Sequence, residues 1–369
     1  MSKAGLALMA VLLSLLTAEI VLEQWNKEPD LLYVWQPNLK HTFYPDSGII
    51  KGIYGPQQFT INAKGMRGEL FTRATQNYLC IGGSTTECLY LDDRKTWFAE
   101  LQKILLEDKR QVEIAGIGKS GTTSRENYLH IKYFAIHQKP LNGVIVMVGI
   151  NDMYQRLNRD TLFDNQFAFT KAIEDSLVNT IFLHPSAAKG WRGLQLVQLV
   201  QRAIYRKQGV NWQLQDDNGK YLAALRLKRF NAPKLDSLPN MQIALAQFER
   251  NLDSMIATAA RAHLQLIFVT QSALYHTNMD TTEQRLLWMG GKNDFQNNTT
   301  AAYYTPEALR KGLEMYNAKV KEVAQRAGIT VVDLDAELPH TAEMFYDDCH
   351  FTEAGAEKVA EIIASHFPK

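Results

Sequence analysis

The sequence has little cysteine: three residues, Cys80, Cys88 and Cys349, among 369. Three cysteines are too few for a fold held together by disulfides, and no Cys-x-x-Cys pair indicates a zinc site. We therefore expect three small buried apolar side chains and no bound metal. A disulfide between Cys88 and Cys349 is the alternative, because both lie close to residues singled out below.

The sequence also lacks an excess of charge of either sign. Its 40 basic and 39 acidic residues leave a net charge of +1, so we expect no nucleic-acid partner. Hydrophobic residues make up 46% and charged residues 21%, as in ordinary globular proteins, which excludes extended disorder. A length of 369 residues suits one large domain with insertions or two modest ones.

Charged residues are scarce in the N-terminal segment, where only Ser14, Thr17 and Glu19 break the apolar run of residues 4–22. About 20 apolar residues suffice to cross a bilayer. Lys3 precedes the run, which places the N-terminus in the cytoplasm by the positive-inside tendency. We expect residues 1–24 to be an uncleaved signal anchor, a single-pass helix with the rest of the chain on the periplasmic or extracellular side. A cleaved signal peptide is the alternative.

Five short runs rich in β-branched residues predict buried strands. They cover residues 78–83, 112–117, 143–149, 264–270 and 330–335. Apolar positions at helical spacing predict helices at residues 96–107, 241–262, 306–327 and 352–367. This alternation predicts a three-layer α/β/α fold, in which helices cover both faces of a central parallel sheet of about five strands.

Two regions break this alternation. Residues 25–73 are mixed and turn-rich, and we expect a lead-in segment packed on the main domain of residues 74–369. Residues 155–240 predict a largely helical insertion in that domain. Within it, residues 190–207 combine apolar side chains with three arginines and a lysine. This pattern is typical of a helix packed on the core, or alternatively of a lid or a helix lying on a membrane surface.

Three motifs follow the first three predicted strands. Gly82-Gly83-Ser84 forms a strand-to-helix turn whose N–H groups suit an anion, although Ser84 can equally cap the next helix. Residues 118–124 are small and let the backbone approach a ligand closely. Asn151 follows the third strand, where its amide can donate to an oxyanion or simply form a turn.

A fourth motif, Asp347-Asp348-Cys349-His350, precedes the C-terminal helix. In a tight turn, Asp347 can accept a hydrogen bond from one ring nitrogen of His350 while the other nitrogen faces a serine. A single Asp-x-x-His pair is common and by itself indicates a capping or surface motif. All four motifs fall at the same end of the predicted sheet, in chain order, which favours a shared site.

The ordered set resembles the SGNH hydrolase family, also called GDSL-type esterases. Ser84 matches the nucleophile of the first block, and Gly121 and Asn151 match residues of the second and third blocks. Asp347 and His350 match the last block. The resemblance covers about residue 59 to the C-terminus apart from the insertion.

Three positions depart from the family pattern: Gly83 stands where Asp is commoner, Gly116 where Asn is frequent, and Lys119-Ser120 replaces an apolar residue and proline. The N-terminal apolar segment and residues 59–69, FTINAKGMRGE, look like the membrane-anchored bacterial branch of the family. A lysine beside the oxyanion turn can alter which substrates fit.

The resemblance implies an SGNH or flavodoxin-like fold and a serine esterase that needs no metal or organic cofactor. Ser84 is then the nucleophile, His350 the general base and Asp347 its orienting carboxylate. The N–H groups of Ser84 and Gly121 and the Asn151 amide would form the oxyanion hole. The implied substrates are short acyl esters, with O-acetyl groups on extracytoplasmic carbohydrate favoured, either hydrolysed or transferred to another hydroxyl.

Two other functions stay open at this point. The chain could be a catalytically silent subunit of a membrane complex, with partner proteins docked on the fold. The presence of Ser84, Asn151, Asp347 and His350 argues against this alternative. The chain could also be a lipase or acyltransferase acting at the membrane surface.

Overall fold

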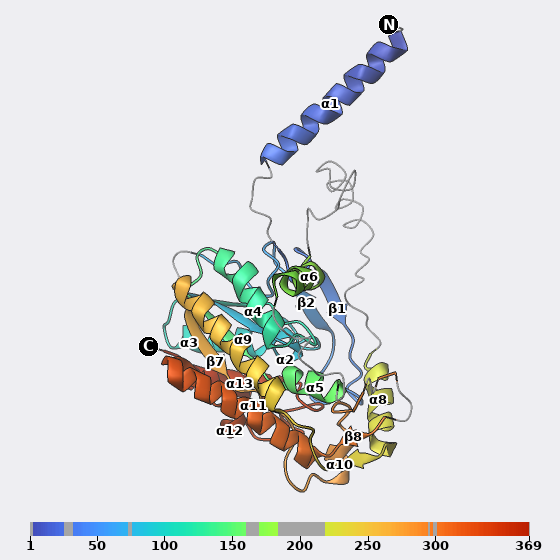
Figure 1. Cartoon of the computed structure of the whole chain (residues 1–369), viewed down its shortest axis with the longest axis vertical. Coiled ribbons are helices and arrows are strands. Elements are labelled where there is room, and N and C mark those ends of the chain that lie inside the picture. The colour runs from blue at the N-terminus through green and yellow to red at the C-terminus, as the bar shows by residue number, and fades with distance from the viewer. Residues whose placement is uncertain are drawn as a thin grey trace.

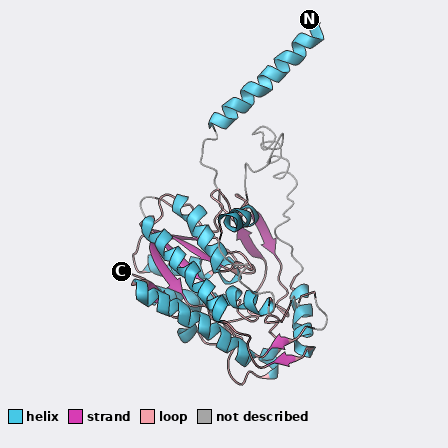
Figure 2. Ribbon diagram, viewed as in Figure 1, coloured by secondary structure: helices cyan, strands magenta, loops and turns pink. Residues whose placement is uncertain are grey.

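The computed structural model describes residues 3–25, 32–72, 76–159, 170–183, 218–293, 296–297 and 301–368. Figure 1 shows an α/β body with the N-terminal helix α1 (Lys3–Trp25) lying apart from it. Within the body the strands lie among helices (Figure 2). One large cluster of buried apolar side chains joins the sheet to the helices that cover it.

The central sheet has five parallel strands in the order β4-β3-β5-β7-β9. They are β3 (Gln76–Gly82), β4 (Val112–Gly116), β5 (Gly143–Met147), β7 (Gln265–Val269) and β9 (Thr330–Val332). Every residue of β5 is buried, because helices cover both faces, and its sequence GVIVM is therefore continuously apolar. The parallel sheet and its five strands are confirmed, although the last strand, expected at residues 330–335, ends at Val332 and helix α12 begins at Leu334.

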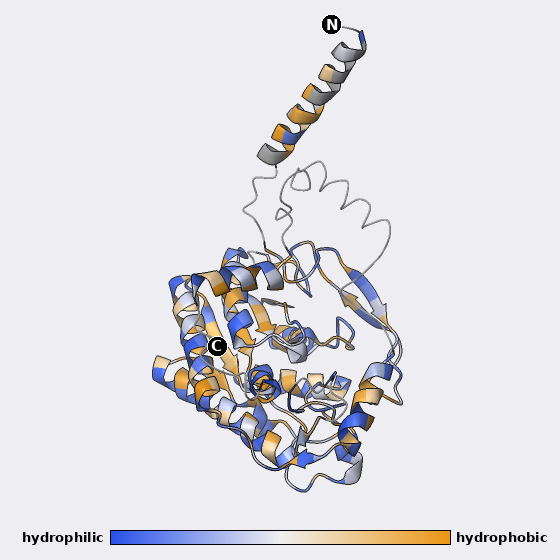
Figure 3. Cartoon of the chain, turned by 45° about the vertical axis from the view of Figure 1, so that its right-hand side comes forward, coloured by the Kyte–Doolittle hydropathy of each residue, from blue (hydrophilic) through white to orange (hydrophobic). Residues whose placement is uncertain are grey.

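Helices pack in two groups. The first consists of α3 (Trp97–Glu107) against α13 (Glu353–Ser365). In the second, α9 (Gln242–Arg261) lies between α4 (Ser124–Tyr133) and α11 (Pro306–Ala327). Right-handed crossovers place such groups on opposite faces of a parallel sheet. Figure 3 shows helices of the body carrying both hydrophobic and hydrophilic residues, as expected for helices with one face on a core.

The helix boundaries follow ordinary capping rules. Thr96, Thr305 and Thr352 each precede a helix and accept a backbone N–H of its first turn. Gly328 ends α11 with a φ of +66°, a conformation that glycine adopts at little cost. The four helices predicted from the sequence are α3, α9, α11 and α13, each within a few residues of its expected bounds.

The segment before β3 is packed on the body. It forms an antiparallel pair of strands, β1 (Lys40–Phe43) and β2 (Gln57–Thr60). Phe43 and Phe59 are buried in the main apolar cluster. Arg67 pairs with Gly116 at the end of β4 through two backbone hydrogen bonds. The lead-in segment is therefore continuous with the core of the domain.

The described part of the insertion is mostly helical. It contains the end of α5 (Ile150–Asn158), then α6 (Lys171–Ile181) and α8 (Lys220–Asn231). Strand β6 (Lys234–Leu235) pairs with β8 (Tyr303–Tyr304) beside α8. The remaining short elements are α2 (Ser84–Glu87), η1 (Ala135–His137), α10 (Thr281–Gln284) and α12 (Leu334–Glu337). The helix predicted at residues 190–207 lies outside the described residues.

Helix α1 covers the apolar N-terminal segment. Over the described residues, no helix combines the length and the apolar character that a membrane crossing requires. The predicted N-terminal segment is therefore helical as expected, but the described residues do not support the expectation that it spans a membrane.

The three cysteines are buried and free. The alternative of a disulfide between Cys88 and Cys349 is therefore wrong. Burial raises the pKa of each thiol, to about 12 for Cys88, so none is a thiolate at neutral pH.

Candidate active site

Two glycines let the chain turn sharply from β3 into α2. A Cβ atom on Gly82 would lie 2.3 Å from Oγ1 of Thr86, and one on Gly83 would lie 2.2 Å from Nδ2 of Asn151. A side chain at Gly82 would also meet the backbone carbonyl of Met147 at 2.9 Å, whereas one at Gly83 would displace the Asn151 amide from its present position. Ser84 is the first residue of α2, so its N–H has no intrahelical acceptor.

Arg67 of the lead-in segment stabilises this turn through hydrogen bonds to its backbone carbonyls. Its guanidinium donates to the carbonyls of Glu87 at 2.7 Å and Cys88 at 2.9 Å, and also to that of Leu91. Its Nε donates to the Asp93 carboxylate at 2.8 Å. Only 3% of the Arg67 side chain is exposed. These bonds supply donors to carbonyls at and after the C-terminal end of α2, of which that of Cys88 also accepts the backbone N–H of Leu91 at 2.9 Å.

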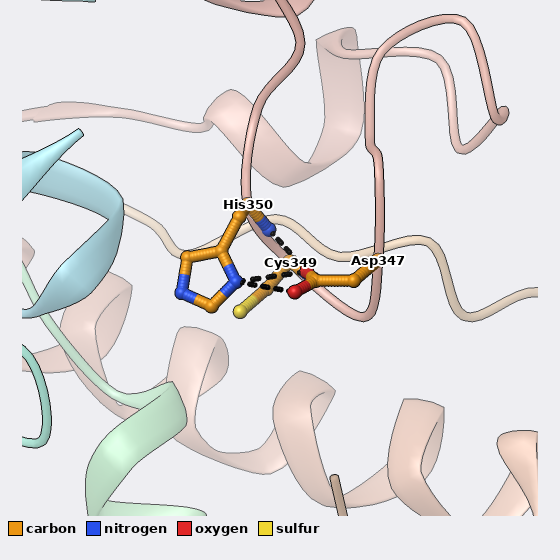
Figure 4. Close-up of side chains that lie close together, drawn as sticks. All are labelled: Asp347, Cys349 and His350. Atoms are coloured by element: carbon orange, nitrogen blue, oxygen red, sulfur yellow. Dashed lines mark hydrogen bonds and ion pairs between the residues drawn. The ribbon is translucent and has the colours of Figure 1, made fainter. Parts of the chain in front are cut away.

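The fourth motif faces Ser84. Nε2 of His350 lies 2.7 Å from Oγ of Ser84, and Nδ1 lies 2.8 and 2.7 Å from the two carboxylate oxygens of Asp347. Oδ1 of Asp347 also accepts the backbone N–H groups of Cys349 and His350 at 3.0 and 2.9 Å. Figure 4 shows the aspartate and the imidazole side by side on one loop. The three-residue spacing thus produces a closed turn that aims the ring at the serine.

The electrostatics of the pair suit a general base. Burial lowers the pKa of His350, but the charge and hydrogen bond of Asp347 more than offset it, so the pKa lies above its usual 6.5. Burial raises the pKa of Asp347, whereas the charge and hydrogen bond of His350 and the charge of Arg226 leave it below the ordinary value. Asp347 is therefore ionised at neutral pH, and His350 accepts a proton readily.

Two further loops bring their residues to the same place. Gly121 has a φ of +78°, which favours glycine. Nδ2 of Asn151 donates to the carbonyl of Thr122 at 2.8 Å, and Asp152 accepts the backbone N–H of Ser124 at 2.9 Å. These bonds tie the loop after β5 to the loop after β4. Burial raises the pKa of Asp152 to about 7, against the opposing effect of the Ser124 hydrogen bonds.

A cleft of about 470 Å³ opens over these residues. Ser84, Gly121, Asn151 and His350 line it. Its lining also includes aromatic, amide and basic side chains: Tyr154, Gln155, Asn158, Arg159, Trp288 and Gln296. Four of the five residues that the sequence singled out therefore line one open cavity, and the fifth, Asp347, is buried behind His350.

Asp347, Cys349 and His350 could in principle hold a metal ion, because their ligand atoms all lie within 4.8 Å of one another (Figure 4). However, Nδ1 of His350 and both oxygens of Asp347 already bind each other, and Nε2 faces Ser84. A metal ion would have to break these hydrogen bonds. As arranged, the cluster fits proton transfer between side chains better than metal ligation.

The other two departures from the family pattern have local explanations. A Cβ on Gly116 would lie 2.8 Å from the ring of Phe98, so that ring occupies the space an asparagine would need. Nζ of Lys119 lies 5.4 Å from the centre of the Trp35 ring, and burial lowers its pKa. The cleft is lined by Ser120 and Gly121 but not by Lys119. The expectation that Lys119 shapes the substrate space has no support from this placement.

Sequence reasoning missed Trp288 and Asp348. Trp288 lines the cleft, and its indole N–H donates to Asp347. Asp348 is fully buried and accepts three hydrogen bonds beside the site. Trp288 lies in a stretch that reads as a polar loop, and no local spacing connects it with the aspartates.

The chain is similar to a known protein family and to several solved structures. Residues 80–358 match the model of the GDSL-like lipase/acylhydrolase family. No curated protein matches the sequence. A similar solved structure is that of LAE5, an α/β hydrolase enzyme from the metagenome of Lake Arreo, Spain. It has 15% identity over 79% of this chain and 94% of that one, with a TM-score of 0.44.

Two other structures are similar at the same level. The acetylxylan esterase Axe2 from Geobacillus stearothermophilus has 15% identity over 79% of this chain and 93% of its own, with a TM-score of 0.42. A lipolytic protein of the G-D-S-L family from Desulfitobacterium hafniense has 12% identity over 79% of this chain and 100% of its own, with a TM-score of 0.41.

Proposed function

Because the chain belongs to the GDSL-like lipase/acylhydrolase family, and is thus a serine ester hydrolase, we propose that Ser84, His350 and Asp347 are its catalytic triad. The observation that carries this proposal is the 2.7 Å separation of Nε2 of His350 from Oγ of Ser84, with Asp347 on the opposite ring nitrogen. A serine is a weak nucleophile until an adjacent base takes its proton, and this arrangement supplies that base.

In the first half of the reaction, Oγ of Ser84 attacks the ester carbonyl while His350 takes the hydroxyl proton. Asp347 stays ionised and stabilises the imidazolium that forms. The negative charge of the tetrahedral intermediate develops in the cleft above Ser84, toward the N–H groups of Ser84 and Gly121 and the amide of Asn151. His350 then gives its proton to the departing alcohol, which leaves an acyl group on Ser84.

In the second half, a water molecule attacks the acyl carbonyl and gives a proton to His350. The bond between the acyl carbon and Oγ of Ser84 then breaks, His350 returns the proton to Oγ, and the acid is released. A carbohydrate hydroxyl that enters instead of water would receive the acyl group, and the enzyme would then act as an O-acyltransferase. The same residues serve both outcomes.

The substrate we propose is a short acyl ester, with O-acetyl groups on carbohydrate favoured. The amides of Gln155, Asn158 and Gln296 offer donors and acceptors suited to sugar hydroxyls, and the ring of Trp288 offers an apolar face. The cleft presents apolar as well as polar surface, so it can hold an acyl group beside a sugar. The amide groups are the feature that favours a carbohydrate ester.

Membrane attachment through α1, with the catalytic body outside the cytoplasm, is also our proposal, and it rests on the apolar sequence of residues 4–22. Fractionation tests it: the full chain should pellet with membranes and resist a carbonate wash, and protease added to spheroplasts should degrade the body. Full recovery in the soluble fraction would contradict it.

The experiment that tests the function compares hydrolysis of p-nitrophenyl acetate, butyrate and palmitate by the wild type and Ser84→Ala. We expect the acetate to be hydrolysed fastest, and Ser84→Ala to lose at least about 10⁴-fold in kcat. Ser254→Ala, which removes a serine hydroxyl on the solvent side of α9, is the matched control and should retain full activity.

Each other outcome points to a different function. No turnover by well-folded wild type, together with stable co-purifying membrane proteins, would identify a silent subunit of a complex. A strong preference for palmitate would indicate a lipase at the membrane surface. Acetylated xylan or another acetylated polysaccharide, assayed by release of acetate, then tests the carbohydrate directly.

A further inference from the structure

Trp288 touches both the triad and the cleft. Nε1 of its indole donates to Oδ2 of Asp347 at 2.9 Å. Its side chain is half-buried and forms part of the cleft wall together with Met289, on the same cavity as His350. One side chain therefore contacts the carboxylate that orients the base and also the space in which a substrate would lie.

Asp348 fixes the segment that carries this tryptophan. Its Oδ2 accepts the backbone N–H groups of Trp288 at 2.7 Å and Met289 at 3.1 Å, and its Oδ1 accepts the hydroxyl of Tyr275 at 2.6 Å. Asp348 is fully buried, so the charge is held by these donors and not by water. The two adjacent aspartates are thus linked through Trp288: Asp347 binds His350, and Asp348 binds the backbone of Trp288, whose indole binds Asp347.

Two arginines of α8 hold the same segment from the insertion side. Arg226 donates to the carbonyls of Leu286 at 3.0 Å and Tyr346 at 2.5 Å, and Arg229 donates to that of Met289 at 2.5 Å. The exposed fractions of Arg226 and Arg229 are 9% and 2%. Burial raises the pKa of Asp348 above its ordinary value, and the charge of Arg229 offsets part of this rise. Burial also raises the pKa of Asp347, but the contributions of His350 and the charge of Arg226 leave it below the ordinary value. The segment of Trp288 is thus bound by the arginines through its carbonyls and by the Asp348 carboxylate through its N–H groups.

We propose that Trp288 is a positioning residue of the triad, whose indole N–H holds the Asp347 carboxylate in the orientation that His350 requires. The inference rests on the proposed function of the triad. Apart from His350, Trp288 is the donor on Oδ2, whereas Oδ1 is fixed by two backbone N–H groups. Without the indole, Oδ2 keeps only its contact with His350, the group that it has to orient, and the carboxylate gains freedom to rotate.

The indole N–H also takes up part of the negative charge on Asp347. A hydrogen bond to a carboxylate weakens its attraction for a neighbouring imidazolium, so removal of the bond should raise the pKa of His350. The other ionisable groups that face the pair come from several elements: Arg226 on α8, Glu87 on α2, and Tyr346, Asp348 and Cys349 on the same loop. Each is retained when the indole alone is changed.

The test uses the full chain with Trp288→Phe, which keeps an aromatic wall and removes the N–H. Two quantities are measured: the pKa of His350 by NMR titration of its ring C–H, and the pH profiles of kcat and kcat/KM with p-nitrophenyl acetate. We expect the pKa of His350 to rise by about half a unit and the acidic limb of kcat/KM to move with it. We expect kcat to fall about 10- to 100-fold, the range for a lost hydrogen bond to a charged group, with KM within about twofold.

Tyr78→Phe is the matched control, because it removes a hydroxyl that donates to Gln265 at 2.7 Å from strand β3, outside the cleft. It should leave the pKa of His350 and kcat unchanged. If Trp288→Phe leaves both unchanged as well, or lowers the melting temperature with no movement of either pH profile, the positioning role is overturned.

A second substitution covers the case in which Trp288→Phe does not fold, and the pKa of His350 is measured separately from esterase activity. If Trp288→Phe does not fold, Trp288→Leu is measured instead, with the same directions expected because it also removes the indole N–H from Oδ2 of Asp347. If the wild type hydrolyses no ester but Trp288→Phe still raises the pKa of His350, the positioning role stands and the proposed esterase function fails. Normal esterase activity with an unmoved pKa of His350 in the variant overturns the positioning role alone.

Discussion

Nε2 of His350 and Oγ of Ser84 lie 2.7 Å apart, although 266 residues separate them along the chain. Ser84 follows the first strand of the sheet, and His350 comes from the loop beyond its last strand, β9. The proton path between them therefore exists only when the whole sheet is assembled. Activity and global folding should be lost together when the protein is denatured.

Replacement of Asp347 by asparagine should lower kcat by about 10⁴-fold. The asparagine amide can donate to Nδ1 of His350, which stabilises the tautomer whose Nε2 cannot accept the serine proton. Steady-state kinetics with an aryl acetate measures the effect. Asp253→Asn, on the exposed side of α9, is the control and should change kcat by less than twofold. A fall of tenfold or less in Asp347→Asn would show that the carboxylate does not orient the base.

Replacement of Asn151 by alanine should lower kcat about 10²- to 10³-fold with little change in KM, since an oxyanion donor acts mainly in the transition state. The loss of its bond to the carbonyl of Thr122 adds a structural effect, which thermal unfolding measures separately. Asn179→Ala on exposed α6 removes a similar amide bond and should keep full activity. A change confined to KM would contradict a role in the oxyanion hole.

Asp152 should make the protein less stable as the pH rises from about 4 to about 7. Its pKa is about 7 in the fold against 3.8 for an ordinary aspartate, so in this range the folded state holds a proton that the unfolded state has lost. Each such group contributes a slope of about 1.4 kcal/mol per pH unit. Urea unfolding of the wild type and Asp152→Asn across this range measures the difference.

The difference between the two proteins is the quantity to compare, because His130 acts in the opposite direction. Burial lowers the pKa of His130 to about 3, and its contribution to stability grows as the pH rises from about 3 to about 6.5. This effect is common to the wild type and Asp152→Asn. Parallel pH curves for the two proteins would refute the role given to Asp152.

Arg67→Lys should destabilise the fold by about 2–4 kcal/mol, because lysine cannot replace a guanidinium that donates to several carbonyls at once. The free energy of unfolding in urea is the measurement. Arg326→Lys is the control: Arg326 is half-exposed, and its ion pairs with Glu249 and Asp253 should contribute little. Equal stability of Arg67→Lys and the wild type would contradict the stabilising role that we assign to the hydrogen bonds from Arg67 to the turn after Ser84.

The sheet was predictable because its strands are continuous apolar runs that end at glycine or polar residues. β5 is the clearest case, with five buried residues directly before the turn that leads to Asn151. The triad was also predictable in outline, since Asp347 and His350 are three residues apart and Ser84 follows a pair of glycines. Local spacing supplied the candidate residues, and the resemblance of the ordered motifs to the SGNH hydrolase family supplied their roles.

The supports of the triad were not predictable from spacing. Trp288 reaches Asp347 across 59 residues, and Arg226 reaches Tyr346 across 120. A tryptophan in a polar stretch and two arginines on a helix are each typical of many surfaces. Their roles depend on which segments the fold brings together, and only the three-dimensional structure supplies that information.

Because Arg67 binds the turn that carries Ser84, the smallest fragment of the protein that we expect to be stable must include the lead-in segment. A truncated chain that starts at residue 74 would retain every group of the triad, yet it would leave the carbonyls of Glu87, Cys88 and Leu91 without their buried donor. The edge of β4 would lose its backbone partner as well. Expression of the body without α1 should therefore begin near residue 32, ahead of both strands of the lead-in segment.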